Sequence, residues 1–123
     1  MASIESLIRS KKNKVEQHQR TIAQIKIIIA DLERLAADLD LQMRAEEERT
    51  KIHDIFNFAY STLAKATIQR RNNLKQSIGN LTIQLGAALS AMHVATEELE
   101  TAEEFLHSHI FSVLPAVQDR ADN

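Results

Sequence analysis

The sequence predicts an all-α protein that folds as an antiparallel two-helix coiled-coil hairpin. This prediction rests on the composition, on a heptad pattern in each half of the chain, and on the order of the charged blocks. The 123 residues include two glycines and one proline, too few for the turns of an all-β or α/β domain. With 4% aromatic residues, long narrow helix packing is favoured over a round core.

The first helix is predicted over about residues 3–50, where apolar residues recur at heptad positions a and d. Position a falls at residues 8, 15, 22, 29, 36 and 43, and position d falls three residues after each. Lys11, His18 and Glu46 are the polar exceptions among the seam positions between residues 4 and 46. Apolar residues also occur at position g, so the stripe is wider than a bare two-helix seam. These g residues are Leu7, Ile28 and Leu35.

The second helix is predicted over about residues 62–114, with position a at 64, 71, 78, 85, 92, 99 and 106. From Leu85 onward its seam alternates large and small residues, which lets the two helix axes approach closely. Pro115 cannot donate a backbone hydrogen bond. We therefore expect the helix to end at about Leu114 and residues 115–123 to form a frayed tail.

The turn is predicted over about residues 51–61, where poor helix formers and three of the five aromatic residues lie. Ser61 or Thr62 can cap the second helix.

The order of the charged blocks decides the topology. The net charges of residues 1–26, 27–62, 63–92 and 93–123 are +4, -4, +4 and -6. Folding the chain back near residue 55 places each block against one of opposite sign, which favours the antiparallel hairpin.

The same composition excludes several functions. Cysteine is absent, which excludes disulfides and thiolate metal sites, and the net charge of -2 argues against nucleic-acid binding. His107 and His109 face different directions on a helix, and Glu104 lies outward, so we expect no metal site. No catalytic motif or cofactor motif occurs. We expect neither an enzyme nor a cofactor. No apolar run reaches membrane-spanning length and no signal peptide is evident, which predicts a cytoplasmic protein.

Three features leave a structural and a partner-binding interpretation open. Arg71 occupies a seam position, where its head can reach Asp38 or Asp40 or contact a partner. Gly79 and Gly86 lie on the outer face, where they are either tolerated or allow another backbone to approach. The apolar residues of the turn either cap the seam or meet a partner; they are Ile55, Phe56, Phe58 and Tyr60.

Residues 29–74 resemble the FliJ family, the stalk component of the flagellar type III export apparatus, in its alphaproteobacterial form. The matching pieces are ADLERLAADLD (30–40), EEER (46–49), FAY (58–60) and AKATIQRRNNL (64–74). FliJ proteins are antiparallel helical hairpins similar to the central stalk of rotary ATPases. Members of the family usually carry proline in the turn and a highly charged helix after the position of Glu104, and this sequence has neither.

The resemblance implies a non-catalytic, chaperone-like adaptor that couples the export ATPase ring to the membrane export gate. The implied partners are the ATPase and the cytoplasmic domain of the gate protein, with export chaperones as further candidates. The implied location is the cytoplasmic side of the inner membrane, reached through partners only. The basic residues near the N-terminus would contact the ATPase; they are Arg9, Lys11, Lys12 and Lys14. Further candidates for partner contacts are Gln69, Arg70, Arg71, Asn73, Phe56, Phe58 and Tyr60.

Two other hypotheses belong to different classes. The chain could self-associate as a structural coiled coil, in which two extended chains pair antiparallel as a rod dimer. It could also form a metal-binding helical bundle, which metal analysis of the pure protein would decide.

Overall fold

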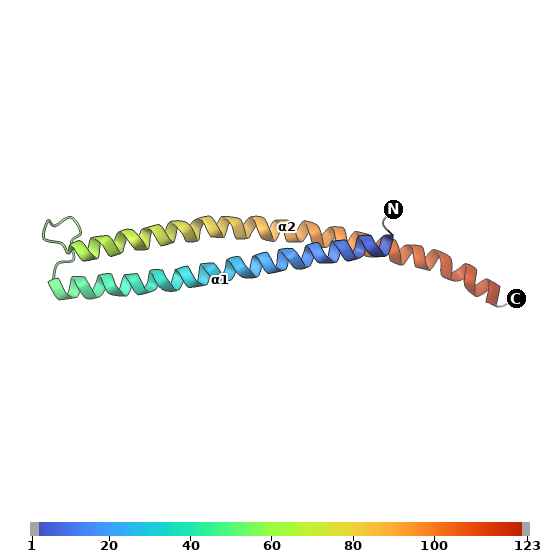
Figure 1. Ribbon diagram of the computed structural model, residues 1–123, viewed down its shortest axis with the longest axis horizontal. Coiled ribbons are helices and arrows are strands. Elements are labelled where there is room, and N and C mark those ends of the chain that lie inside the picture. The colour runs from blue at the N-terminus through green and yellow to red at the C-terminus, as the bar shows by residue number, and fades with distance from the viewer. Residues whose placement is uncertain (1–2, 122–123) are drawn as a thin grey trace. The chain divides into compact units, whose positions relative to one another are not determined.

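The computed structural model describes the backbone of residues 3–121 and the side chains of residues 3–111. It contains two long helices packed against each other, α1 (Ile4–Thr50) and α2 (Thr62–Ala121), joined by a turn over residues 51–61 (Figure 1). No strand occurs in the described part of the chain. The predicted all-α hairpin is therefore confirmed, as are the bounds of α1 and the turn to within a residue.

The helices form two compact units. Unit 1 pairs the N-terminal segment that ends at Ile22 with the segment of α2 that begins at Ala87, and unit 2 comprises Ala23–Gly86. Within unit 2, Asp40 contacts Arg71 whereas Glu46, further along α1, contacts Ser61, earlier in the chain. The contacts move in opposite directions along the two segments. The helices of this unit are therefore antiparallel.

The heptad pattern identifies the seam. Every predicted a and d position of α1 and α2 is buried or half-buried. Among the most deeply buried are three alanines, Ala36, Ala64 and Ala95, and Ala64 has no exposed surface at all. These small side chains let the backbones approach closely. Thr67 is also buried, and its hydroxyl donates to the Leu63 carbonyl at 2.9 Å, so its polar group is satisfied inside the seam.

Both helix ends at the turn have a local cause. Lys51 has a φ of 61°, the left-handed conformation that commonly ends a helix, and its N–H still bonds the Glu47 carbonyl at 2.8 Å. On the other side, the Ser61 hydroxyl accepts from the Ala64 N–H at 3.2 Å. Ser61 is thus the N-cap of α2, one of the two caps expected from the sequence.

The end of α2 differs from the prediction. The helix continues through Pro115 to Ala121, so the expected end at Leu114 and the expected frayed tail are corrected over residues 115–121, while residues 122–123 lie outside the described residues. An interior proline removes one N–H donor and its ring crowds the carbonyl four residues earlier, so this part of the helix carries a cost of about 3 kcal/mol. Over the residues described, neither helix is long and apolar enough to cross a membrane.

Candidate partner-binding surfaces

The turn of unit 2 is built by two side chains that substitute for glycine and proline. The Asp54 carboxylate accepts from the Phe56 N–H at 3.0 Å, and the Asn57 side chain accepts from the Ala59 N–H at 2.9 Å. Two backbone bonds, Asn57 N–H to Asp54 O and Tyr60 N–H to Asn57 O, close successive turns. Asp and Asn stabilise such turns by bonding to the backbone two residues on. The segment therefore has a defined conformation despite lacking glycine.

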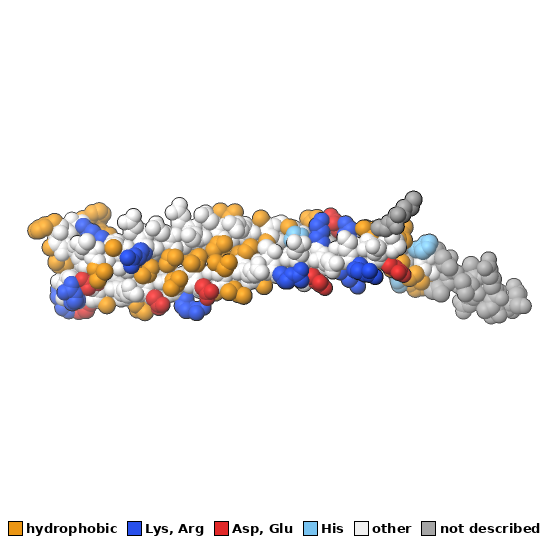
Figure 2. All heavy atoms as spheres, in the orientation of Figure 1, with side chains coloured by type: hydrophobic (Ala, Val, Ile, Leu, Met, Phe, Trp, Pro, Cys, Tyr) orange, Lys and Arg blue, Asp and Glu red, His pale blue; other side chains and the backbone are white. Residues whose placement is uncertain are grey.

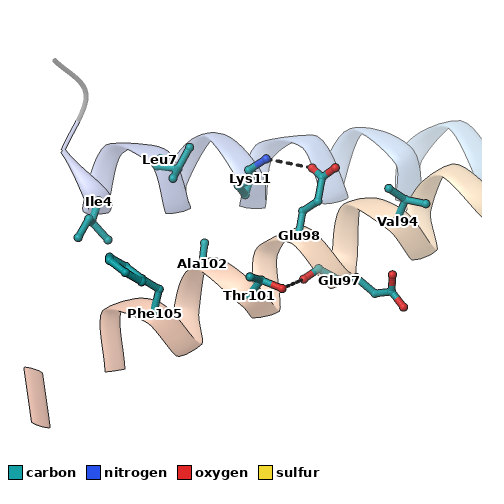
Figure 3. A pocket seen from close by; sticks show the side chains of 9 residues that line it. All are labelled: Ile4, Leu7, Lys11, Val94, Glu97, Glu98, Thr101, Ala102 and Phe105. Atoms are coloured by element: carbon teal, nitrogen blue, oxygen red, sulfur yellow. Dashed lines mark hydrogen bonds and ion pairs between the residues drawn. The ribbon is translucent and has the colours of Figure 1, made fainter. Parts of the chain in front are cut away.

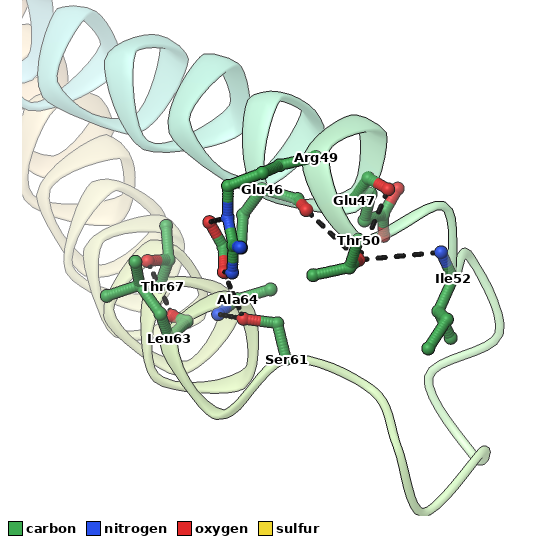
Figure 4. A network of polar contacts seen from close by, with 9 residues as sticks. All are labelled: Glu46, Glu47, Arg49, Thr50, Ile52, Ser61, Leu63, Ala64 and Thr67. Atoms are coloured by element: carbon green, nitrogen blue, oxygen red, sulfur yellow. Dashed lines mark hydrogen bonds and ion pairs between the residues drawn. The ribbon is translucent and has the colours of Figure 1, made fainter.

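A polar clamp holds this turn to the end of α1, and Figure 4 shows its residues Glu46, Glu47 and Ser61. We use this name for Glu46, Glu47, Tyr60 and Ser61. The Ser61 hydroxyl donates to Glu46 Oε1 at 2.8 Å, and the Tyr60 hydroxyl donates to Glu47 Oε1 at 2.6 Å. Hydrogen bonds from charged Arg49 and then from Ser61 lower the pKa of Glu46 to about 2. Burial, and then the bond to Glu47, raise the pKa of Tyr60 to about 12.

The clamp divides the aromatic residues of the turn into two groups. Tyr60 is 3% exposed and fills the end of the seam, whereas Phe56 is 93% exposed and Phe58 is 98% exposed. Tyr60 is thus placed inside the protein and does not present a partner surface, which corrects its inclusion among the candidates. The two phenylalanines keep nearly their whole apolar surface in water. Exposed aromatic groups on an ordered loop are typical of recognition sites.

The basic residues near the N-terminus also fall into two groups, one that forms an ion pair within the hairpin and one that does not. Lys11 Nζ bonds Glu98 Oε2 at 2.9 Å within unit 1, and this bond lowers the pKa of Glu98. Lys11 therefore has a partner within unit 1 of the hairpin. Arg9, Lys12 and Lys14 are exposed and make no ion pair with any other described residue. Arg9 and Lys12, at heptad positions b and e, lie on one side of α1, whereas Lys14, at position g, lies on the other side of the seam. We call these three exposed residues the basic surface.

Arg71 takes the structural role. Its guanidinium Nη1 donates to Asp40 Oδ1 at 2.8 Å, and this hydrogen bond lowers the pKa of Asp40. Among the described side chains, Arg71 Nε is buried without a hydrogen-bond partner, as expected for a side chain whose stem packs in the seam. Its neighbours Gln69, Arg70 and Asn73 are exposed, so these three remain candidates for partner contacts.

Each unit carries a groove where its two helices meet, on the side of heptad position g. The groove of unit 1 runs past Leu7 and Phe105, with Lys11 and Glu98 bridging its floor (Figure 3). In unit 2, apolar side chains gather along the junction of α1 and α2 (Figure 2). The groove there, which we call the Leu35 groove, is lined by Leu35, Asp38, Leu39, Gln42, Arg70, Asn73 and Leu74. The excess of apolar g residues is the only signal of these grooves in the sequence.

The remaining sequence features contribute no site. A Cβ added at Gly79 or Gly86 would meet no atom within 4 Å, so both glycines lie on an open outer face. No group of three or more His, Cys, Asp or Glu residues in the described region is arranged to hold a metal ion. His107 instead makes an edge contact with the Phe111 ring, at 4.3 Å between centroids.

Comparison with known proteins does not assign this chain to a family. No family model matches it, and searches of curated proteins and of solved structures find no match. The class defined by the fold and by the surfaces above is an antiparallel coiled-coil hairpin with exposed basic and aromatic groups.

Proposed function

We propose that this chain is a non-catalytic coiled-coil stalk and adaptor of the flagellar type III export apparatus. In this role it links the export ATPase ring to the membrane export gate on the cytoplasmic side. The observation that carries the proposal is that some candidate residues bond within the hairpin while others are exposed to solvent. Lys11, Arg71 and Tyr60 each bond to a carboxylate of the hairpin itself, while charged and aromatic groups near them face solvent. This division suits a hairpin that acts through its surface. A two-helix hairpin also lacks the enclosed pocket that acid–base catalysis requires.

The basic surface is the proposed contact with the ATPase. Three cations within six residues of α1, two on one side of the helix and one on the other, attract an acidic partner and accelerate the encounter. Arg9 and Lys12 form no ion pair with the described residues, so binding through them breaks none, whereas Lys14 already interacts electrostatically with Glu98. Phe56 and Phe58 in the turn are proposed contacts with the gate, together with the exposed residues Gln69, Arg70 and Asn73. The resemblance of residues 29–74 to the FliJ family supports this choice of partners.

A pull-down with the export ATPase and the cytoplasmic domain of the gate protein tests the proposal. The variant carries Arg9→Glu, Lys12→Glu and Lys14→Glu. The matched control carries Arg20→Glu, Lys26→Glu and Lys65→Glu, which reverses three exposed bases outside the basic surface. The proposal expects the native chain and the control to retain the ATPase and the variant to lose it at least tenfold, with unchanged helicity. Failure of the native chain to bind either partner would contradict it.

A further inference from the structure

The Leu35 groove contains charges of both signs that the hairpin itself does not use. Asp38 is exposed on the α1 wall and Arg70 is exposed on the α2 wall. Neither makes an ion pair or hydrogen bond with another described residue, whereas their neighbours Asp40 and Arg71 bond to each other at 2.8 Å. The bond between Asp40 and Arg71 sets how α1 and α2 are aligned along their common axis. It places Asp38 and Arg70 within about one helical turn of the same height.

The apolar part of the groove is wider than a two-helix seam requires. Leu35 is 52% exposed although it lies at the helix junction, and Ile28, one heptad earlier at the same position g, is also exposed. Leu63, at position g of α2, is exposed as well, but Ile28 and Leu63 lie outside the groove lining and the following g positions of α2 are polar, so the apolar g stripe of this unit belongs to α1. A stripe of a, d and g residues is the pattern of a helix in a four-helix layer, whereas a two-helix seam needs only a and d.

We infer that the Leu35 groove is the interface of a homodimer, in which two hairpins associate side by side as a four-helix bundle in this unit. The argument for a second copy is self-complementarity. A two-fold axis parallel to the helices sets α1 of each copy against α2 of the other, running antiparallel. Because Asp38 and Arg70 lie at about one height on opposite walls, this operation brings Asp38 of each copy opposite Arg70 of the other. It also covers Leu35 of both copies.

The dimer covers residues that the proposed function assigns to a partner. Arg70 and Asn73 line the groove, so the dimer and a complex made through these residues exclude each other. The dimer is thus a resting form that a partner must dissociate. The inference of the interface itself does not depend on the identity of that partner.

Charge reversal tests the interface directly. Asp38→Arg sets a second base opposite Arg70 of the other copy, and Arg70→Glu sets a second acid opposite Asp38. Each change acts twice in a symmetric dimer, so each single variant should weaken dimerisation roughly tenfold or more. Lys65→Glu, which reverses an exposed base on the outer face of α2, is the control and should leave the dimer intact. The measurement is sedimentation equilibrium, where the native chain should approach twice its mass of 13.9 kDa.

Mixing the two single variants provides the decisive arm. In a heterodimer, the arginine introduced at position 38 of one chain meets the glutamate introduced at position 70 of the other. The native Arg70 of the first chain meets the native Asp38 of the second, so both contacts again join opposite charges. The mixture should therefore dimerise although each variant alone does not.

Circular dichroism of each variant checks that helicity is unchanged, so that loss of the dimer reports on the interface. A native chain that stays monomeric at high micromolar concentration overturns the inference. A dimer that the single changes leave unaffected overturns it as well, as does a mixture that stays monomeric.

Discussion

The burial pattern of α1 predicts very different costs for two identical substitutions. Ile22 lies in the seam and is 7% exposed, whereas Ile27, little more than one turn later on the same helix, is 62% exposed. Truncating a buried isoleucine to alanine removes its transfer energy and leaves a gap, which in protein cores costs about 2–5 kcal/mol. Because the seam of a hairpin is a single layer flanked by water, which can reach the gap, the lower end applies. We expect Ile22→Ala to cost about 2 kcal/mol.

Ile27→Ala is the matched control because it removes the same atoms from a solvated position. Its cost should lie within about 0.5 kcal/mol of zero, since alanine also has the higher helix propensity. Urea unfolding followed by circular dichroism measures the free energy of unfolding of both variants, and a thermal scan measures their melting temperatures. All measurements use one protein concentration, so that any self-association is constant. Ile22→Ala should lower the melting temperature by roughly 6–10 °C. Equal costs for the two variants, or a neutral Ile22→Ala, would refute the assigned seam.

Three further outcomes follow from the turn of unit 2. Replacing Phe56 and Phe58 with serine should change stability by less than about 0.5 kcal/mol, because both are almost fully exposed, yet it should weaken gate binding in a pull-down. The pKa of Glu46 is lowered from 4.5 to about 2, so the stability it provides is complete above pH 4.5 and is lost as the pH falls toward 2. Acid titration of native chain and Glu46→Gln should show a shallower loss in the variant over that range. Replacing Asp54 and Asn57 with alanine should leave both helices intact but accelerate proteolytic cleavage of the turn, measured by limited digestion; unchanged cleavage would argue against the two side-chain turns.

The fold could be predicted because each of its determinants is local or periodic. The heptad positions of α1 and α2 depend only on residue spacing, and every one of them is buried or half-buried. The cap at Ser61 follows from a preference of the N-cap position for serine. The end of α2 could not be predicted in the same way. Pro115 indicates a helix end because proline removes an N–H donor and its ring clashes with the carbonyl four residues earlier, yet the helix continues to Ala121.

The surfaces were harder to predict because they depend on which side chains pair across the helices. The sequence places Tyr60 with Phe56 and Phe58 in one aromatic cluster, but the carboxylate of Glu47 gives only Tyr60 a hydrogen-bond partner. Phenylalanine has no polar atom that the clamp can hold. Likewise, Arg71 pairs with Asp40 whereas the adjacent Arg70 stays exposed. The register indicates this difference, because Arg71 lies at position a and Arg70 lies at position g. The sequence leaves two possible partners for Arg71, Asp38 and Asp40, and does not choose between them.

A distance measurement within unit 1 tests the central claim, that one chain folds back on itself. Spin labels at Ile8 and Leu99, both seam positions of this unit, should be measured in labelled chain diluted with an excess of unlabelled chain. The hairpin predicts an intrachain separation of roughly 20 Å or less, because helices that pack side by side lie about 8–10 Å apart. A chain that remains one extended helix would separate the labels by about 135 Å at 1.5 Å per residue. Loss of the short distance on dilution would contradict the hairpin.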